Sequence, residues 1–237
     1  MITVRPAVAR RHYRRRQLDV WRTFDPRDRA NPIAGGFGAL ELLDEGRLPP
    51  GAPIPQQPRG DAELLTYVRE GAVAYEDAMG GSGVIHAGEF QRMTAVHGRR
   101  HGQVNASRTH WAHVLQIRLR SSAELEFGRE QKRFSAAQRR GGLCVVASPD
   151  AQRGSLRLHQ DARIYSALLE RGQHVVHELL PGRGAWLHLV HGQLQLADLA
   201  LATGDGAAIT AERAVSLTAS AETEILLVDL DAVTSSG

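Results

Sequence analysis

Hydrophobic and polar residues alternate in short runs along much of this chain. Leu115, Ile117 and Leu119 lie two residues apart, so in a strand their side chains would share one face. Gln116 and Arg118 stand between them and would share the opposite face. Such period-two runs predict a protein built from many short antiparallel strands.

Glycine residues separate these runs. Leu187–His191 and Gln193–Leu196 repeat the alternation, and the spacing between turns is roughly ten residues, as a sandwich or barrel requires. The best helical candidate is short, Ser135–Arg139, and falls where a linker between two β lobes would lie. The turn glycines are Gly71, Gly80, Gly81, Gly88, Gly98, Gly141, Gly142, Gly154, Gly172, Gly192, Gly204 and Gly206.

The order of strands and turns repeats weakly between the two halves. Glu70-Gly71 is followed by Ala87-Gly88-Glu89 in the first half, and His191-Gly192 by Thr203-Gly204-Asp205 in the second. Each half thus has a glycine turn and then a glycine turn with an acidic residue. The repeat predicts two barrels of related design.

Length and hydropathy allow two domains without a membrane span. The chain has 237 residues, 42% of them hydrophobic, which is enough for a sizeable core. No segment reaches the roughly eighteen uninterrupted apolar residues of a membrane helix, and the arginine-rich start has no apolar signal-peptide stretch. We therefore expect a cytoplasmic protein that does not bind membranes.

A single cysteine, Cys144, excludes a disulfide framework and any cysteine-based metal cluster built within one chain. Its neighbours Leu143, Val145 and Val146 predict a buried strand. Inert packing is the interpretation we favour for Cys144, with a redox sensor as the alternative.

The charge gives little support for nucleic-acid binding, because the net charge is only +3. One dense basic cluster surrounds Tyr13 near the N-terminus. We expect a solvated terminal segment there, and the alternative is a contact with phosphates or an acidic partner. Its arginines are Arg5, Arg10, Arg11, Arg14, Arg15 and Arg16.

Several motifs, spread in order over nearly the whole chain, resemble those of the pirin family. The most continuous stretch runs from Asp61 to His101 and includes Ala87-Gly88-Glu89-Phe90-Gln91 and Gly98-Arg99-Arg100-His101. The other matching segments are Leu18–Phe24, Ser148-Pro149-Asp150, Gly154-Ser155-Leu156 and His159-Gln160-Asp161.

The resemblance implies an all-β bicupin, with two antiparallel cupin barrels, each a double-stranded β-helix, joined by short helical or linker segments. It places the N-terminal barrel at residues 1–132 and the C-terminal barrel at 133–237. Pirins hold one metal, commonly iron, in the N-terminal barrel. Some bacterial pirins oxidise flavonols such as quercetin with dioxygen, and eukaryotic pirins act as transcriptional co-regulators.

The family's metal ligands are a His-x-His pair and a His-x-Glu pair. Residues i and i+2 point to the same face of a strand, so two such pairs can converge inside a barrel. Alignment with the family places Gln57 and Arg59 at the first pair and His101 and Gln103 at the second. His101 alone is retained, whereas Arg59 stays protonated and repels a cation, so we expect no tightly bound metal.

These four positions leave three interpretations open. Gln57, Arg59 and Gln103 could hydrogen-bond one another, with Asp61 or Glu63 neutralising Arg59. Alternatively, the four side chains line a pocket for an anion or a polar small molecule. The third interpretation is a metal held elsewhere, for which the histidine candidates are His97, His174, His177, His188 and His191. Because His174/His177 and His188/His191 are three apart in apparent strands, their side chains would face opposite ways.

The function we expect is a metal-free, non-catalytic pirin-like protein that binds a small polar or anionic molecule. The first alternative is a quercetin 2,3-dioxygenase-like enzyme using Fe or another divalent transition metal at an atypical site, with His101 as the candidate catalytic residue. The second is a transcriptional co-regulator acting through a protein partner. No Gly-rich phosphate loop or nucleophile elbow supports the enzyme independently.

Overall fold

The protein is built almost entirely of β-strands. The computed structural model describes residues 1–15, 17–28, 31, 33–55, 61–77, 80–95, 102–121 and 127–231. The helical elements in these ranges are short: α1 (Ala136–Arg139) and the 3₁₀ turns η1 (Ala7–Ala9) and η2 (Gln152–Gly154). The all-β prediction is confirmed, and no helix in the described ranges is long and apolar enough to cross a membrane.

The chain forms two compact units. The N-terminal lobe comprises Arg11–Gly36 and Leu40–Phe134. The C-terminal lobe comprises Met1–Arg10, Phe37–Ala39 and Ser135–Gly237. The domain bounds taken from the family, residues 1–132 and 133–237, stay predictions.

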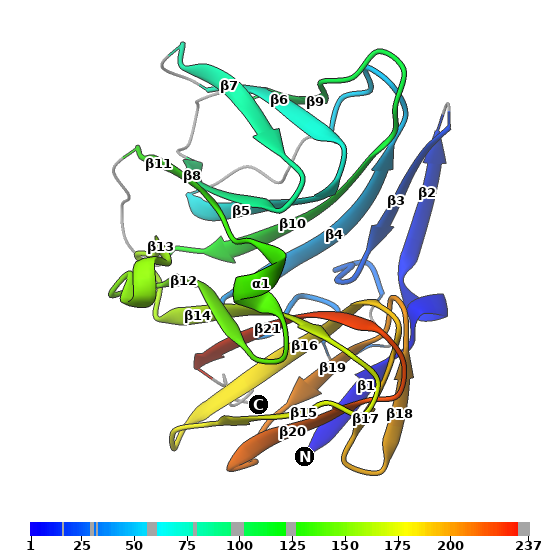
Figure 1. Ribbon diagram of the computed structural model, residues 1–237, viewed down its shortest axis with the longest axis vertical. Helices are drawn as coiled ribbons and strands as arrows, with labels where there is room; N and C mark the ends of the chain where they lie inside the picture. The colour runs from blue at the N-terminus through cyan, green and yellow to red at the C-terminus, as the bar shows by residue number, and fades with distance from the viewer. Residues whose placement is uncertain are drawn as a thin grey trace. The chain divides into compact units, whose positions relative to one another are not determined.

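Two facing sheets make up the N-terminal lobe (Figure 1). Its core draws on both sheets, because Leu48, Val68 and Val114 come from the larger one and Val73 and Ile85 from the smaller. The interior of a barrel therefore lies between them. The larger sheet has the order β11 (Arg129–Arg133), β8 (Glu89–Ala95), β5 (Ala62–Glu70), β10 (Ala112–Arg120), β4 (Leu40–Leu48), β3 (Leu18–Arg22), β2 (Arg11–Arg15). The smaller has the order β7 (Ser82–His86), β6 (Ala72–Glu76), β9 (Gly102–Asn105).

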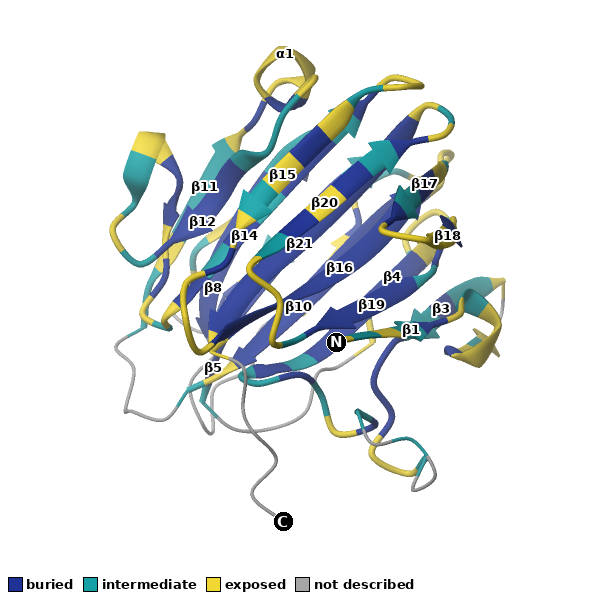
Figure 2. Ribbon diagram, turned by 90° about the horizontal axis from the view of Figure 1, so that it is seen from below, coloured by how far each residue is buried: buried dark blue, intermediate teal, exposed yellow. Residues whose placement is uncertain are grey.

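The C-terminal lobe is built in the same way around a larger apolar core. Figure 2 shows β16 and β21 buried along most of their length. The larger sheet has the order β1 (Ile2–Arg5), β19 (Gly206–Ile209), β16 (Arg183–His191), β21 (Thr223–Asp231), β14 (Ala162–Leu169), β12 (Cys144–Ser148), β13 (Leu156–Arg157). The smaller has the order β15 (His174–Glu178), β20 (Ala214–Ala219), β17 (Gln193–Leu196), β18 (Leu199–Ala202).

The internal repeat of the sequence corresponds to a repeated topology. The run β8-β5-β10-β4-β3 in one lobe matches β19-β16-β21-β14-β12 in the other, and β7-β6-β9 matches β18-β17-β20. Gly71 turns β5 into β6, and Gly192 makes the equivalent turn from β16 into β17. Both glycines have a positive φ, 78° and 96°, which side chains with a Cβ seldom adopt. The prediction of two related barrels is confirmed.

The arginine-rich start is solvated only in part. β1 pairs antiparallel with β19 at the edge of the larger C-terminal sheet, where Ile2 and Val4 pack against the apolar core (Figure 1). Arg5 and Arg10 are buried, whereas Arg14 and Arg15 of β2 are exposed. The prediction of a solvated segment is therefore wrong for the part around β1, where the alternating Ile2 and Val4 supply an apolar face that the density of arginines obscures.

The helix α1 and the strand β12 lie where the sequence predicts a short helix and a buried strand. Ser135 caps α1: its hydroxyl accepts from the Gln138 backbone N–H, and the Gln138 side chain accepts from the Ser135 backbone N–H. Cys144 begins β12 and is half-buried, and burial raises the pKa of its thiol. A raised pKa favours the packing interpretation over a reactive thiolate.

Candidate functional site

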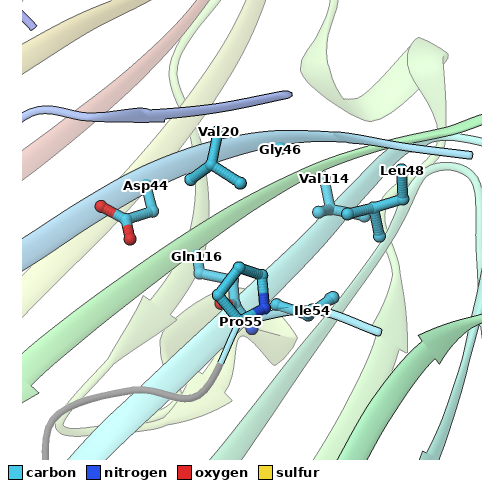
Figure 3. A pocket seen from close by; sticks show the side chains of 8 residues that line it. All are labelled: Val20, Asp44, Gly46, Leu48, Ile54, Pro55, Val114 and Gln116. Atoms are coloured by element: carbon cyan, nitrogen blue, oxygen red, sulfur yellow. The ribbon is translucent and has the colours of Figure 1, made fainter. Parts of the chain in front are cut away.

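A small recess opens inside the N-terminal lobe. About 250 Å³ of space between atoms lies within and above it, open solvent included, but the part that other atoms enclose has room for about one water-sized group. Figure 3 shows its lining side chains. Strand β3 supplies Val20, and the segment after β4 supplies Ile54 and Pro55. The remaining lining residues are Asp44, Gly46 and Leu48 of β4 and Val114 and Gln116 of β10.

Strand alternation explains why these residues line the recess. Gly46 and Val114 are directly paired, as are Asp44 and Gln116, so successive positions on one face of β4 and β10 stand side by side. The apolar residues form most of the wall. Asp44 and Gln116 provide a polar end, an arrangement typical of small-molecule sites.

Asp44 is held by an arginine. The guanidinium of Arg22 lies 3.1 Å from a carboxylate oxygen of Asp44. Burial alone would lower the pKa of Arg22, but the hydrogen bonds and charge of Asp44 outweigh burial and raise it. Arg22 therefore stays protonated in a partly buried pair with Asp44.

Gln103, the residue predicted to stand in place of the family's glutamate, lies in β9 and is buried. Its Nε2 donates to the hydroxyl of Thr66 at 3.2 Å and to Oε1 of Gln91 at 3.5 Å. Its Oε1 accepts from Nε2 of Gln116 at 2.7 Å. Both ends of the Gln103 amide are thus engaged by neutral partners, directly behind the polar end of the recess.

The hydrogen bonds continue beyond Gln103 toward the surface. Nε2 of Gln91 donates to Oε1 of Gln131 at 3.3 Å. Nε2 of Gln131 in turn donates to the carboxylate of Glu89 at 2.8 Å and to the backbone carbonyl of Val84 at 2.9 Å. The interior cluster therefore ends at a half-buried carboxylate.

Three of the four predicted site residues, Gln57, Arg59 and His101, lie outside the described residues, as does His97. The predicted convergence of Gln57, Arg59 and His101 on Gln103 stays a prediction, and so does the neutralisation of Arg59 by Asp61 or Glu63. Within the described ranges, Gln103 meets Thr66, Gln91 and Gln116 instead.

The described part of this site does not fit a divalent cation. An amide is neutral, and the carbonyl oxygen of Gln103 already accepts a short hydrogen bond from Gln116. Nowhere in the described ranges do three or more His, Cys, Asp or Glu side chains form a group that could hold a metal ion.

The histidine pairs of the C-terminal lobe lie in strands, as predicted. His174 of β15 is exposed and lies 2.9 Å from the hydroxyl of Ser216. His177, on the opposite face of β15, lies 2.7 Å from the carboxylate of Asp229. In β16, His188 is buried and His191 is exposed.

Sequence reasoning did not identify Thr66, Gln91, Gln131 or Asp44 as site residues. Gln116 was recognised only as the polar face of its strand. The usable signal was Gln116, a glutamine between the apolar residues Leu115 and Ile117 of a predicted strand, since a buried amide needs partners.

Sequence comparison identifies relatives along nearly the full chain. The family profile described as "Pirin" matches residues 4–119, and that described as "Quercetinase C-terminal cupin domain" matches residues 145–230. The protein named quercetin 2,3-dioxygenase of Escherichia coli strain K12 is 38% identical over 98% of this chain and 100% of its own length. A Caulobacter vibrioides protein named pirin-like is 30% identical over 84% of this chain and 86% of its own.

Solved structures give the same picture. The bacterial pirin YhhW from Escherichia coli, in complex with nickel(II), is 36% identical, with a TM-score of 0.89 over 98% of this chain and all of that one. A second structure of YhhW has a TM-score of 0.91 at 37% identity, and covers 98% of this chain and 99% of that chain.

Proposed function

Because this chain belongs to the pirin family of bicupin proteins, we propose that it is a metal-independent member, which binds a small polar molecule in the recess of its N-terminal lobe. The observation that carries the proposal is the amide of Gln103. It is hydrogen-bonded at both ends to neutral side chains, and the resemblance to the family aligns it with the carboxylate of the family's ligand set.

The recess supports binding rather than turnover. Its walls of Val20, Leu48, Ile54, Pro55 and Val114 would remove apolar surface of a ligand from water. The polar end would fix the ligand's orientation through hydrogen bonds. Among the described residues that line the recess, the carboxylate of Asp44 is the one group that could act as a general base, and it is paired with Arg22.

Metal analysis tests this proposal. Protein purified without an affinity tag should contain much less than one equivalent of iron, nickel or copper per chain by plasma mass spectrometry. Quercetin turnover should stay near background after addition of Fe²⁺, Ni²⁺ or Cu²⁺. Near-stoichiometric metal would overturn the proposal.

A second candidate, a metal-dependent quercetin 2,3-dioxygenase, is favoured by the name of the 38% identical relative and by the nickel-bound pirin structure. Its signature would be a metal-stimulated loss of quercetin absorbance that disappears in His101→Ala. His101 is the retained member of the family's ligand set, so this variant separates enzymatic oxidation from oxidation by free metal.

A further inference from the structure

The strand β15 lies at the edge of the smaller sheet of the C-terminal lobe. It pairs with β20 on one side, and no other described strand pairs with it. An edge strand of this kind presents backbone N–H and C=O groups with which a further strand can pair. Figure 2 shows β15 at the margin of its sheet, with exposed and more buried positions alternating along it.

The hydrogen bonds to β20 and its flanking residues show which backbone groups of β15 point outward. The N–H of Ala219 donates to the carbonyl of Gln173, and the N–H of Leu179 donates to the carbonyl of Arg213, both at 2.9 Å. The register between these two bonds is unbroken, so odd-numbered residues bond to β20. The even-numbered residues therefore direct their N–H and C=O groups away from β20. They are His174, Val176 and Glu178.

The same even-numbered residues carry the exposed side chains of β15. His174 and Glu178 are exposed at the two ends of the strand. Val176 in the middle is 53% exposed, and Leu180, two residues beyond the strand, is 63% exposed. The edge thus offers an apolar centre between an imidazole and a carboxylate.

This order of side chains is complementary to itself. If a second β15 lies antiparallel beside the first, centred on Val176, the two valines face each other. At both ends, His174 of one copy then faces Glu178 of the other, and directly opposite side chains of this kind attract. The hydroxyl of Ser216 lies 2.9 Å from Nε2 of His174 and can donate to it, which leaves Nδ1–H to donate to the carboxylate of the other copy. The outward backbone groups match in the same register, because each facing pair can exchange both N–H···O bonds.

The edge strands β2, β11 and β18 lack this complementarity. The same arrangement puts Arg11 opposite Arg15 in β2, and Arg129 opposite Arg133 in β11. Like charges directly opposite each other destabilise a pair of strands. β18, at the other edge of the smaller sheet, is exposed at Leu199 but carries no charged side chain that would set a register.

We propose that β15 is a self-association edge, through which two copies of this chain join their smaller C-terminal sheets into one continuous sheet. The inference is independent of the proposed binding function, since it involves the C-terminal lobe alone. A five-residue edge buries less surface than a standard interface. The dimer should therefore be weak, forming at roughly 100 µM protein and dissociating at roughly 1 µM.

Sedimentation velocity of the full chain over this concentration range tests the proposal. Val176→Lys places two ammonium groups face to face at the centre of the pairing, so the dimer Kd should rise at least about tenfold. Leu199→Lys is the matched control, because it makes the same kind of change at an exposed apolar residue of the opposite edge. It should leave the Kd unchanged, and both variants should keep the wild-type circular dichroism spectrum.

A charge exchange tests the register. His174→Glu places a carboxylate opposite Glu178 of the other copy, so the Kd should rise by at least about fivefold. Adding Glu178→His to that variant restores an imidazole opposite each carboxylate with the ends exchanged. The double variant should return to within about twofold of the wild-type Kd. A merely local role of either side chain within one copy would give no such rescue.

Backbone amide exchange followed by NMR tests the edge itself. The amides of His174, Val176 and Glu178 should exchange more slowly at roughly 100 µM than at roughly 10 µM protein, because pairing covers them. Those of Val175 and His177, which bond to β20, should exchange at the same rate at both concentrations.

Three results would overturn the proposal. The first is a wild type that remains monomeric at roughly 100 µM. The second is a dimer that Leu199→Lys weakens and Val176→Lys does not, which would assign the pairing to β18. The third is protection of β15 that does not depend on concentration. A double variant that associates no better than His174→Glu would overturn the two-fold register.

Discussion

At the scale of single residues, Gln103 has a structural role that its position in the sequence does not reveal. Its amide satisfies Thr66, Gln91 and Gln116, all buried. A buried polar group left without a partner costs about 1–3 kcal/mol. The residue is therefore part of the packing of the lobe as well as of the recess.

Gln103→Leu should lower the free energy of unfolding by about 2 kcal/mol, because the buried side chains of Gln116 and Thr66 each lose a hydrogen-bond partner. Urea unfolding followed by circular dichroism measures this. Val104→Leu, at the next position of β9 and on its exposed side, is the control and should change stability by less than about 0.5 kcal/mol. Equal stability of the two variants would show that the amide contacts contribute nothing.

The triple change Gln57→His, Arg59→His and Gln103→Glu should create a metal site. It restores three imidazoles and a carboxylate at the family's positions. The wild type should bind little metal, whereas the triple variant should bind Fe²⁺ or Ni²⁺ and gain about 2.7 kcal/mol of stability at a hundredfold excess over its Kd. Arg59→His alone should achieve less. Equal metal content in wild type and triple variant, measured by plasma mass spectrometry, would contradict the predicted convergence.

Sequence reasoning could locate Gln103 but not its partners. The resemblance to the family singles out the position of Gln103, and strand alternation predicts that its side chain points into the barrel. The pairings of β5 with β8 and with β10 align Gln91, Thr66 and Gln116 side by side in the larger sheet. Gln103 meets them from the smaller sheet, where β9 pairs with β6. This arrangement depends on the register of strands far apart in the sequence. No local pattern encodes that register.

At the scale of elements, the tight turns of the repeat are more constrained than their glycines alone suggest. A Cβ on Gly192 would overlap the backbone carbonyl oxygen of Glu222, whereas a Cβ on Gly172 would meet open space. Both residues have positive φ, 96° and 85°. A side chain at Gly172 or at Gly192 therefore has the same conformational cost from the positive φ. Only at Gly192 does it also overlap the backbone.

Gly192→Ala should destabilise the protein more than Gly172→Ala. The cost at Gly172 should be about 1–2 kcal/mol from the left-handed conformation alone. Gly192→Ala adds a backbone displacement between β16 and β21, so its melting temperature should fall further. Calorimetry of the two variants checks this, and identical melting temperatures would show that the turn adapts without cost.

A second constraint joins the two sheets of the C-terminal lobe. Asp229 of β21 accepts from His177 of β15 at 2.7 Å and from Nε of Arg183 of β16 at 2.5 Å. Burial would raise the pKa of Asp229, but these two hydrogen bonds and the charge of Arg183 outweigh it and lower the pKa. The carboxylate thus links the smaller sheet to the larger one.

This link predicts a pH dependence of stability. Because the folded pKa of Asp229 lies below the ordinary value of about 3.9, its contribution is present above that value and is lost as the pH falls through the folded pKa. Asp229→Asn should cost about 3 kcal/mol at pH 7 and less below pH ~3. Asp161→Asn, on the same arginine but largely exposed, is the control and should cost under about 1 kcal/mol. A cost that does not shrink in acid would contradict the assignment.

Elements were easier to predict than their orientation. Period-two runs gave the strands, and the capping box gave α1. The polar face of β10 was harder: Gln116 shares its face with Val114, which packs in the core between the two sheets. Leu115, Ile117 and Leu119 lie on the other face and are buried as well. When both faces of a strand are buried, the alternation of apolar and polar residues does not show which face points into the barrel.

At the scale of the whole molecule, the repeat predicts the two lobes. It does not predict that the first strand, β1, belongs to the C-terminal lobe. β1 pairs with β19, about two hundred residues later, and Arg11 then begins the other lobe. The sequence of Ile2–Arg5 does not indicate with which strand it pairs. Only the apolar alternation of Ile2 and Val4 indicates that the segment is buried at all.

Replacing Ile2 and Val4 together by alanine should loosen the C-terminal lobe selectively. Hydrogen exchange measured by mass spectrometry should speed up in β19 and β16, since β1 covers the edge of β19. Exchange in β5 and β10 should stay as in the wild type. Thr3→Ala, on the exposed side of β1, should leave all four strands unchanged. Faster exchange in the N-terminal lobe as well would show that β1 supports both.

The pairing of β1 with β19 also sets an order of events during synthesis. At roughly 5–20 residues per second, some 10–40 s separate the emergence of Arg5 from that of Gly206 at the ribosome. During that interval the N-terminal lobe can form its own sheets, whereas β1 cannot yet pair because β19 has not been synthesised. The nascent chain therefore carries a strand with no partner for most of its translation. Arg5 and the arginines that follow it repel the same segment of a neighbouring nascent chain. This repulsion disfavours intermolecular pairing of β1 with another copy.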